Sequence, residues 1–169
     1  MAIYRIWNGP APTTAPQVAV TTGTLIKTML QVKGVAALLM NVKAWGVSMD
    51  GAAAAAGVQW ELIETGTIFG TVSAHVAAGC VPVDARAMKQ PAGTFFSFGT
   101  AATGFTATVE GSIVASRVLD GAFVQPTGER SWEFSLGNGR VIEAVSALRI
   151  RCKAAVAVNA LCWAEIEVG

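Results

Sequence analysis

Turn-forming residues divide this chain into short segments, and their spacing is the feature that most restricts its fold. Among its 169 residues are 18 glycines and six prolines, and turn signals recur every ~8–12 residues. The segments between them alternate apolar and polar residues and are rich in β-branched side chains, which is typical of strands. Many short strands predict an all-β fold. We expect a single antiparallel β-sandwich domain, jelly-roll-like in its connections, with an extended N-terminal arm.

Alternating side chains place the first strand of the sandwich at 24–33. Apolar residues from Leu25 to Leu39 also fall at helical spacing, but Gly34 and the β-branched content favour two strands. The alanine run 52–56 is too short for an independent helix and is expected to be a loop or a single helical turn. Further strands are expected over 35–50, 58–64, 67–75, 95–98, 104–109, 112–119, 122–125, 132–136, 141–148, 148–153 and 161–168.

Two turns predict hairpins in the middle of the chain. The segments 58–64 and 67–75 flank Thr65-Gly66 and are expected to pair. The segments 132–136 and 141–148 flank Gly137-Asn138-Gly139, and an Asn-Gly step is typical of a tight hairpin.

A third hairpin is expected at the C-terminal end, between 148–153 and 161–168, folded about Ala157. This register gives compatible partners on both faces of the hairpin. The opposed pairs are Cys152–Cys162 on an apolar face, and Arg149–Glu165 and Arg151–Trp163 on the other face. The register would also bring two thiols together. Reduced cysteines are expected in a protein that assembles inside a cell, and the redox state of this pair stays open.

Charge and hydropathy argue against several classes of protein. Twelve basic and eleven acidic side chains give a net charge of +1, whereas a nucleic-acid binder carries a basic surface. Hydrophobic residues make up 53% of the chain, which excludes a disordered chain. Apolar runs fall short of the ~20 residues of a membrane span, and the start is not expected to be a secretory signal. We expect no nucleic-acid or membrane partner, and the apolar surplus indicates an oligomer or a larger assembly.

The N-terminal residues 1–16 are predicted to be an arm and linker ahead of a sandwich domain at 17–169. Three of the six prolines fall within 8–16, which cannot form a regular element. The apolar stretch before it is typical of a strand that adds to a neighbour's sheet, the alternative being an edge strand within its own subunit. Deleting residues 2–9 is expected to abolish partner binding and leave the fold intact. The expected partner-binding residues are Ile3, Tyr4, Arg5, Ile6 and Trp7.

No combination of residues predicts catalysis or metal binding. His75 is the single histidine, and Ser73 precedes it on the same strand face, but the spacing supplies no partner for a general base. Cys80, Cys152 and Cys162 form no CxxC pair. We therefore expect no catalytic residue, no cofactor, no metal and no enzymatic activity.

Tryptophan is the one residue type that suggests a ligand. In a row on one sheet face, indole rings could stack a sugar or a peptide, whereas in a β-sandwich such rings more often belong to the core or to an interface. The five tryptophans are Trp7, Trp45, Trp60, Trp132 and Trp163.

Three parts of the chain carry a family resemblance. They are 26–31 (IKTMLQ), 45–51 (WGVSMDG) leading into 58–63 (VQWELI), and 104–111 (GFTATVEG) with 148–151 (LRIR). From residue 24 onward the chain resembles small virion structural proteins of tailed bacteriophages, particularly those of phages that infect actinobacteria. The resemblance implies a head decoration (cement) protein, commonly a β-sandwich or jelly-roll trimer seated on the major capsid lattice. It carries over no functional residues, because the family has no chemical motif.

The resemblance therefore sets the expected function. We expect a non-enzymatic virion structural protein that binds the outer surface of the major capsid lattice and stabilises the head. Its partners would be the major capsid protein and copies of itself in a homotrimer. Its place would be the capsid exterior of a virion made in the bacterial host cytoplasm. Two alternatives stay open, a tail or tail-tip component and a glycan-binding module for host attachment.

Overall fold

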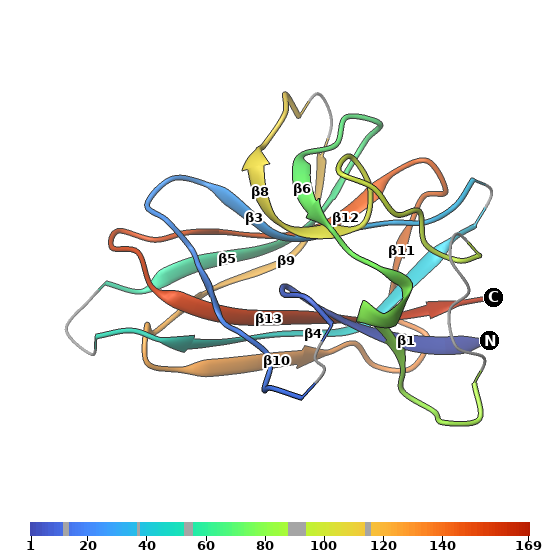
Figure 1. Ribbon diagram of the computed structural model, residues 1–169, viewed down its shortest axis with the longest axis horizontal. Coiled ribbons are helices and arrows are strands. Elements are labelled where there is room, and N and C mark those ends of the chain that lie inside the picture. The colour runs from blue at the N-terminus through green and yellow to red at the C-terminus, as the bar shows by residue number, and fades with distance from the viewer. Residues whose placement is uncertain (12–13, 37, 53–55, 88–93, 114–115) are drawn as a thin grey trace.

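The computed structural model describes residues 1–11, 14–36, 38–52, 56–87, 94–113 and 116–169. They form two antiparallel sheets packed face to face, with the N-terminus and C-terminus close together at one end (Figure 1). The predicted all-β sandwich is confirmed. The jelly-roll connectivity stays a prediction.

Sheet A is the lower layer in Figure 1 and contains the two ends of the chain. Its central strands are long, because they alternate apolar and polar residues without interruption. In spatial order the strands are β10 (Glu129–Glu133), β4 (Met40–Asp50), β13 (Asn159–Val168), β1 (Ala2–Trp7) and β7 (Cys80–Pro82). In addition, β11 (Arg140–Ile142) pairs with β4 and β2 (Val20–Thr21) pairs with β13.

Sheet B is the upper layer. In spatial order its strands are β6 (Thr71–Ala74), β8 (Gly104–Val109), β3 (Lys27–Lys33), β12 (Ala147–Lys153), β5 (Val58–Thr65) and β9 (Ser116–Val124). A short 3-10 turn, η1 (Ala77–Gly79), leads from β6 at the edge of sheet B to β7 at the edge of sheet A.

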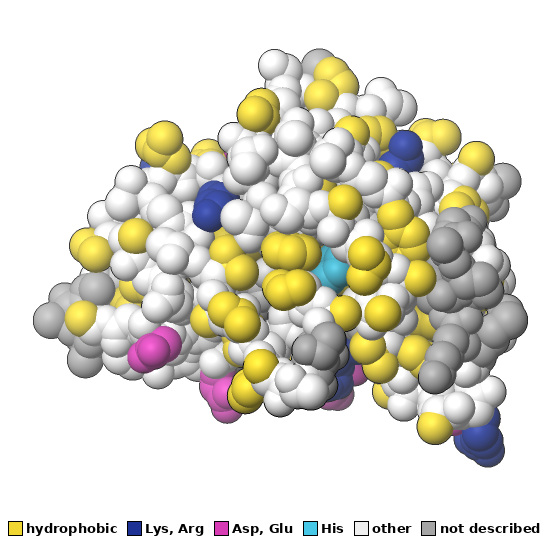
Figure 2. Space-filling model, viewed as in Figure 1, with side chains coloured by type: hydrophobic (Ala, Val, Ile, Leu, Met, Phe, Trp, Pro, Cys, Tyr) yellow, Lys and Arg dark blue, Asp and Glu magenta, His cyan; other side chains and the backbone are white. Residues whose placement is uncertain are grey.

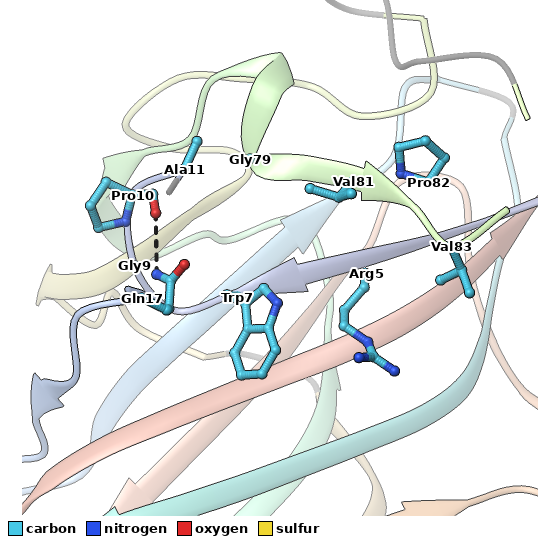
Figure 3. A pocket seen from close by; sticks show the side chains of 10 residues that line it. All are labelled: Arg5, Trp7, Gly9, Pro10, Ala11, Gln17, Gly79, Val81, Pro82 and Val83. Carbon is cyan, nitrogen blue, oxygen red and sulfur yellow. Dashed lines mark hydrogen bonds between the residues drawn. The ribbon is translucent and has the colours of Figure 1, made fainter. Parts of the chain in front are cut away.

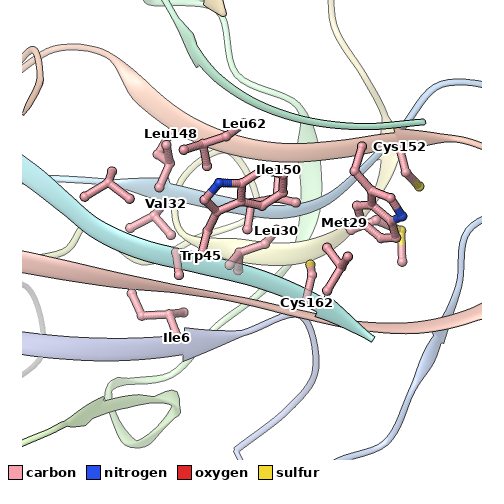
Figure 4. Packing of buried hydrophobic residues seen from close by; sticks show 14 of the residues in the cluster. Ile6, Met29, Leu30, Val32, Trp45, Leu62, Leu148, Ile150, Cys152 and Cys162 are labelled. Carbon is pink, nitrogen blue, oxygen red and sulfur yellow. The ribbon is translucent and has the colours of Figure 1, made fainter. Parts of the chain in front are cut away.

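The core lies between the inward faces of the two sheets (Figure 4). Ile6 and Trp45 reach it from sheet A, and residues such as Leu62 and Ile150 reach it from sheet B. Each such side chain contributes ~1.5–3 kcal/mol when fully buried. Trp45 and Trp60 are completely buried. Trp45 Nε1 donates to Asp120 Oδ2 at 3.1 Å, so this tryptophan is a core residue and not a surface platform.

Most expected strands are present, but the two middle hairpins are wrong. β5 pairs with β12 and β9, while β6 pairs with β8. β10 and β11 do not pair with each other, since both pair with β4. Turn residues are a local signal, and the partner of a strand is chosen by packing across the whole sheet. In the alanine run 52–56, residues 53–55 lie outside the described residues.

The C-terminal hairpin is also wrong, because the chain changes sheets between its two strands. β12 belongs to sheet B and β13 to sheet A. Their apolar faces therefore meet across the core instead of lying side by side, which buries both of them more fully. Cys152 and Cys162 enter the same core cluster from opposite sheets, and both are unpaired.

The N-terminal segment 2–7 is a strand of its own subunit and not an arm ahead of the domain. β1 lies inside sheet A, between β13 and β7, with Ala2 opposite Val168 and Trp7 opposite Trp163. Asn8 anchors the residue that follows, since its Nδ2 donates to the Ala160 carbonyl at 3.0 Å. Deleting residues 2–9 would remove an interior strand, so we now expect this deletion to disrupt the fold.

Loops of the same chain cover the outer face of sheet B around Arg149 and Gln31. Arg149 of β12 is fully buried there and donates to the carbonyls of Ile68, at 2.8 Å, and Glu110, at 3.0 Å. Gln31 of β3 donates to the Ala102 carbonyl at 2.6 Å and accepts from the Gly70 N–H at 2.9 Å. The loop that follows β5 and the loops on both sides of β8 are thus held over sheet B by polar side chains of its central strands.

Candidate functional site

β1 divides the expected partner-binding residues into two sets. Tyr4 and Ile6 point into the core and are fully buried, so they cannot contact a partner. Ile3, Arg5 and Trp7 alternate with them and face the outside of sheet A, because successive side chains of a strand point to opposite faces. Three of the five residues therefore remain candidates.

Arg5 and Trp7 line a hollow of about 260 Å³ between β1, β7 and residues 9–11 and 17 (Figure 3). Its walls are mostly apolar, and the Gln17 amide donates to the Pro10 carbonyl at 3.1 Å and braces the loop wall. Val81 and Val83 are 45% and 53% exposed on its far side. We call the group Ile3, Arg5, Trp7, Val81 and Val83 the β1–β7 surface.

Sequence reasoning missed the β7 half of this surface. The alternation of Val81 and Val83 around Pro82 was a usable signal, but no strand was predicted between 75 and 95. A further hollow of about 510 Å³ shares Val83 with the first and extends the surface past Ile3 to Met1. The apolar surface thus runs along the outer side of β1 and β7.

Arg5 is held in a fixed orientation at the floor of the first hollow. Its Nε donates to Glu165 Oε1 at 2.9 Å, and the two side chains form a salt bridge. Its guanidinium carbon lies 4.7 Å from the centroid of the Trp163 ring. The sequence predicted arginine partners for Glu165 and Trp163, but Arg5 of the neighbouring strand takes both places instead of Arg149 and Arg151.

The edge of β7 is closed to strand addition. Val83 donates its N–H to the Ile3 carbonyl at 2.9 Å. The backbone nitrogen of the preceding residue, Pro82, therefore points away from β1, toward the open edge. Proline has no N–H to offer a further strand, and natural edge strands are commonly protected in this way. The β1–β7 surface therefore offers side-chain contacts and not a free N–H at Pro82 for main-chain pairing.

His75 serves as a structural link to β1. It is 3% exposed, and its Nε2 donates to the Trp7 carbonyl at 2.6 Å. Its Nδ1 is buried without a partner among the described residues, and burial lowers the pKa of the ring. The ring lies among hydrophobic side chains in Figure 2. Ser73 is exposed and makes no hydrogen bond to the His75 ring within the described part of the chain. The structure therefore does not join Ser73 and His75 as a nucleophile and its base.

The cysteines are poorly suited to chemistry at neutral pH. Burial raises the pKa of Cys80 and of Cys152 to about 12, and raises the pKa of Cys162 well above its ordinary value. A thiol reacts and binds metal as the thiolate, so these residues act as core side chains. Across the described residues no group of three or more His, Cys, Asp or Glu is placed to hold a metal ion.

Comparison with known proteins leaves the surface to be interpreted from its own chemistry. No protein-family model and no curated protein matches the chain. Within the described ranges, no helix has the length and apolar character needed to cross a membrane. The arrangement on the outside of sheet A is suited to binding through apolar contacts, aromatic rings and an oriented arginine.

Proposed function

We propose that this chain is a non-enzymatic virion structural protein, a capsid decoration protein that binds the outside of the major capsid lattice and stabilises the head. The β1–β7 surface is the single observation that supports an attachment role, since it leaves Trp7, Val81 and Val83 accessible around an apolar hollow. The family resemblance in the sequence supplies the partner. In this proposal the protein is a homotrimer on the capsid exterior.

The stabilising effect would come from burial repeated over many copies. Apolar area removed from water contributes ~25 cal/mol per Å², and a single small contact gives a modest affinity. Bridging several capsid subunits converts later contacts into intramolecular ones, which raises avidity without new chemistry. The protein would then oppose the pressure of packaged DNA without any catalytic group.

The test compares two sets of substitutions on the same capsids. Val81→Asp combined with Val83→Asp places two charges in the apolar surface and is expected to abolish capsid occupancy. The control is Val109→Asp, at a valine of sheet B that is 60% exposed, and it is expected to bind normally. Circular dichroism checks the fold, and mass photometry reports the oligomer and the copies bound. Undiminished occupancy by the double variant contradicts the proposal.

A tail or tail-tip component is the second possibility within the same class of protein. The same measurement separates the two, because a tail component would leave bare capsids unoccupied and bind purified tails.

A further inference from the structure

We infer that a third hollow on the outer face of sheet A, separate from the two hollows along the β1–β7 surface, is a saccharide-binding site. It has a volume of about 510 Å³, which falls within the ~300–1,000 Å³ of ordinary ligand pockets. Residues of β1, β13, β4 and β10 line it, including Trp7, Trp163, Leu161, Ser48, Ser131 and Glu129. We call it the Trp163 hollow.

One wall of the Trp163 hollow is aromatic. The rings of Trp7 and Trp163 come from directly opposed residues and lie 6.3 Å apart, tilted by 52°. Both side chains are partly exposed. An indole ring offers a flat apolar face to the C–H groups of a pyranose and an N–H donor at its edge.

The other wall is polar and has no partners within the protein. Ser48, Ser131 and Glu129 are exposed, and among the described residues their side chains make no hydrogen bond or ion pair. The indole N–H groups of Trp7 and Trp163 are likewise without a partner there. The hollow thus presents acceptors at the carboxylate and hydroxyls beside two aromatic rings, and a sugar can donate to the acceptors while its C–H groups pack on the rings.

The position of Trp163 depends on glycine. A Cβ on Gly46 would lie 2.7 Å from three atoms of the Trp163 ring, so the indole rests directly on the backbone of β4. Arg5 lies 4.7 Å from the ring centroid. The ring is therefore held before any ligand arrives, which lowers the entropic cost of binding.

The chemistry of the lining favours a saccharide over a second protein chain. A protein interface of ordinary kind has an apolar centre that is depleted of charge. Here a carboxylate, two hydroxyls and Arg130 lie around two indole rings, and this mixture of aromatic faces and polar groups suits a sugar ring. The site shares Trp7 with the β1–β7 surface, but it rests on different residues and does not require the proposed function.

The experiment is a titration of the full chain with maltose, cellobiose and lactose, followed by tryptophan fluorescence and by saturation-transfer NMR. At least one disaccharide is expected to bind saturably. Glu129→Gln is expected to weaken that binding about tenfold or more, because it removes a charged hydrogen-bond acceptor. Trp7→Ala is expected to abolish it, and Ser131→Ala provides a second surface variant that leaves the core untouched.

Glu133→Gln is the matched control, since Glu133 is an exposed glutamate on the same strand that does not line the hollow. It is expected to leave saccharide binding unchanged, as is the Val81→Asp, Val83→Asp double variant. Absence of saturable binding to all three disaccharides overturns the inference. So does binding that Glu129→Gln and Trp7→Ala leave unaltered. If Glu129→Gln reduces capsid occupancy while no disaccharide binds, the hollow belongs to a protein interface and the saccharide site is refuted.

Discussion

The outer faces of the two sheets differ in how far loops of the same chain cover the side chains of the central strands. On sheet B, Arg149 and Gln31 face outward from central strands, yet both are fully buried because loops of the same chain lie over them. On sheet A, Trp7 and Trp163 occupy equally central strands and remain partly exposed. Loops of the same chain take up hydrogen bonds of Arg149 and Gln31, whereas Ser48, Ser131 and Glu129 on the outside of sheet A have no partner among the described residues.

This contrast separates structural residues from binding residues better than residue type does. A buried arginine is expensive unless its hydrogen bonds are made, so Arg149 is committed to holding the loops. The partly exposed ring of Trp7, whose N–H has no partner among the described residues, holds no other part of the chain by a hydrogen bond of its side chain. Substitutions on sheet B should therefore act on stability, and substitutions on sheet A should act mainly on binding.

The largest effect is expected for Arg149→Ala. Removing the guanidinium leaves the carbonyls of Ile68 and Glu110 without this donor. It also removes the positive charge whose Nη1 lies 3.9 Å from the Glu110 carboxylate. The free energy of unfolding should fall by ~3–5 kcal/mol. Urea denaturation measures this loss. Arg151→Ala is the control on the same strand, because Arg151 pairs with Glu61 in a partly exposed site and should cost ~1 kcal/mol or less. Equal losses would remove the distinction between covered and open positions on sheet B.

Gly46→Ala is expected to have the next largest effect. The new methyl group would collide with the Trp163 ring, and overpacking of this kind costs ~1–3 kcal/mol. A double-mutant cycle with Trp163→Ala tests the cause, since the cost should shrink once the ring is gone. Gly57→Ala is the control, because its added Cβ would meet its nearest neighbour at 3.6 Å. A cost that persists without Trp163 would show that the indole does not rest on Gly46.

His75 follows β6 of sheet B and binds the Trp7 carbonyl of sheet A. Its contribution to the free energy of unfolding should depend on pH. Burial lowers the pKa of the folded ring, while the unfolded chain titrates near ~6.5. Stability is therefore complete above about pH 6.5 and is lost as the pH falls from there toward the folded pKa, with a slope of up to ~1.4 kcal/mol per pH unit. His75→Gln should show a flatter dependence when unfolding is measured between pH ~7 and ~5. Parallel curves for the two proteins would contradict this.

The smallest effect is expected for Glu165→Gln. The Arg5 side chain is 43% exposed, and partly solvated ion pairs contribute ~0.2–1 kcal/mol. The loss should diminish further at high salt, because screening weakens the pair. A loss as large as that of Arg149→Ala would mean that sheet A depends on its outer polar groups as much as sheet B does.

The final two strands show how far the sequence could go. Alternation correctly identified the faces that contain Cys152 of β12 and Cys162 of β13 as apolar, and both residues are in the core. It could not tell whether those faces lie side by side in one sheet or meet across the core, because both arrangements bury the same residues. The same limit explains why Glu165 was assigned to Arg149 and is paired with Arg5.

The sequence by itself determined the strand content, the inward and outward sides of most strands and the absence of a recognisable catalytic motif. These properties follow from turn residues and from a period of two, which are local. Only the tertiary structure decided that 2–7 is an interior strand, that Arg149 is covered while Trp7 is open, and that Trp7 and Trp163 share one face. Each depends on contacts between residues far apart in the chain, such as Trp7 with Trp163 and Arg149 with Ile68. The energy of such contacts comes from burial and hydrogen bonding that exist only once both sheets have formed.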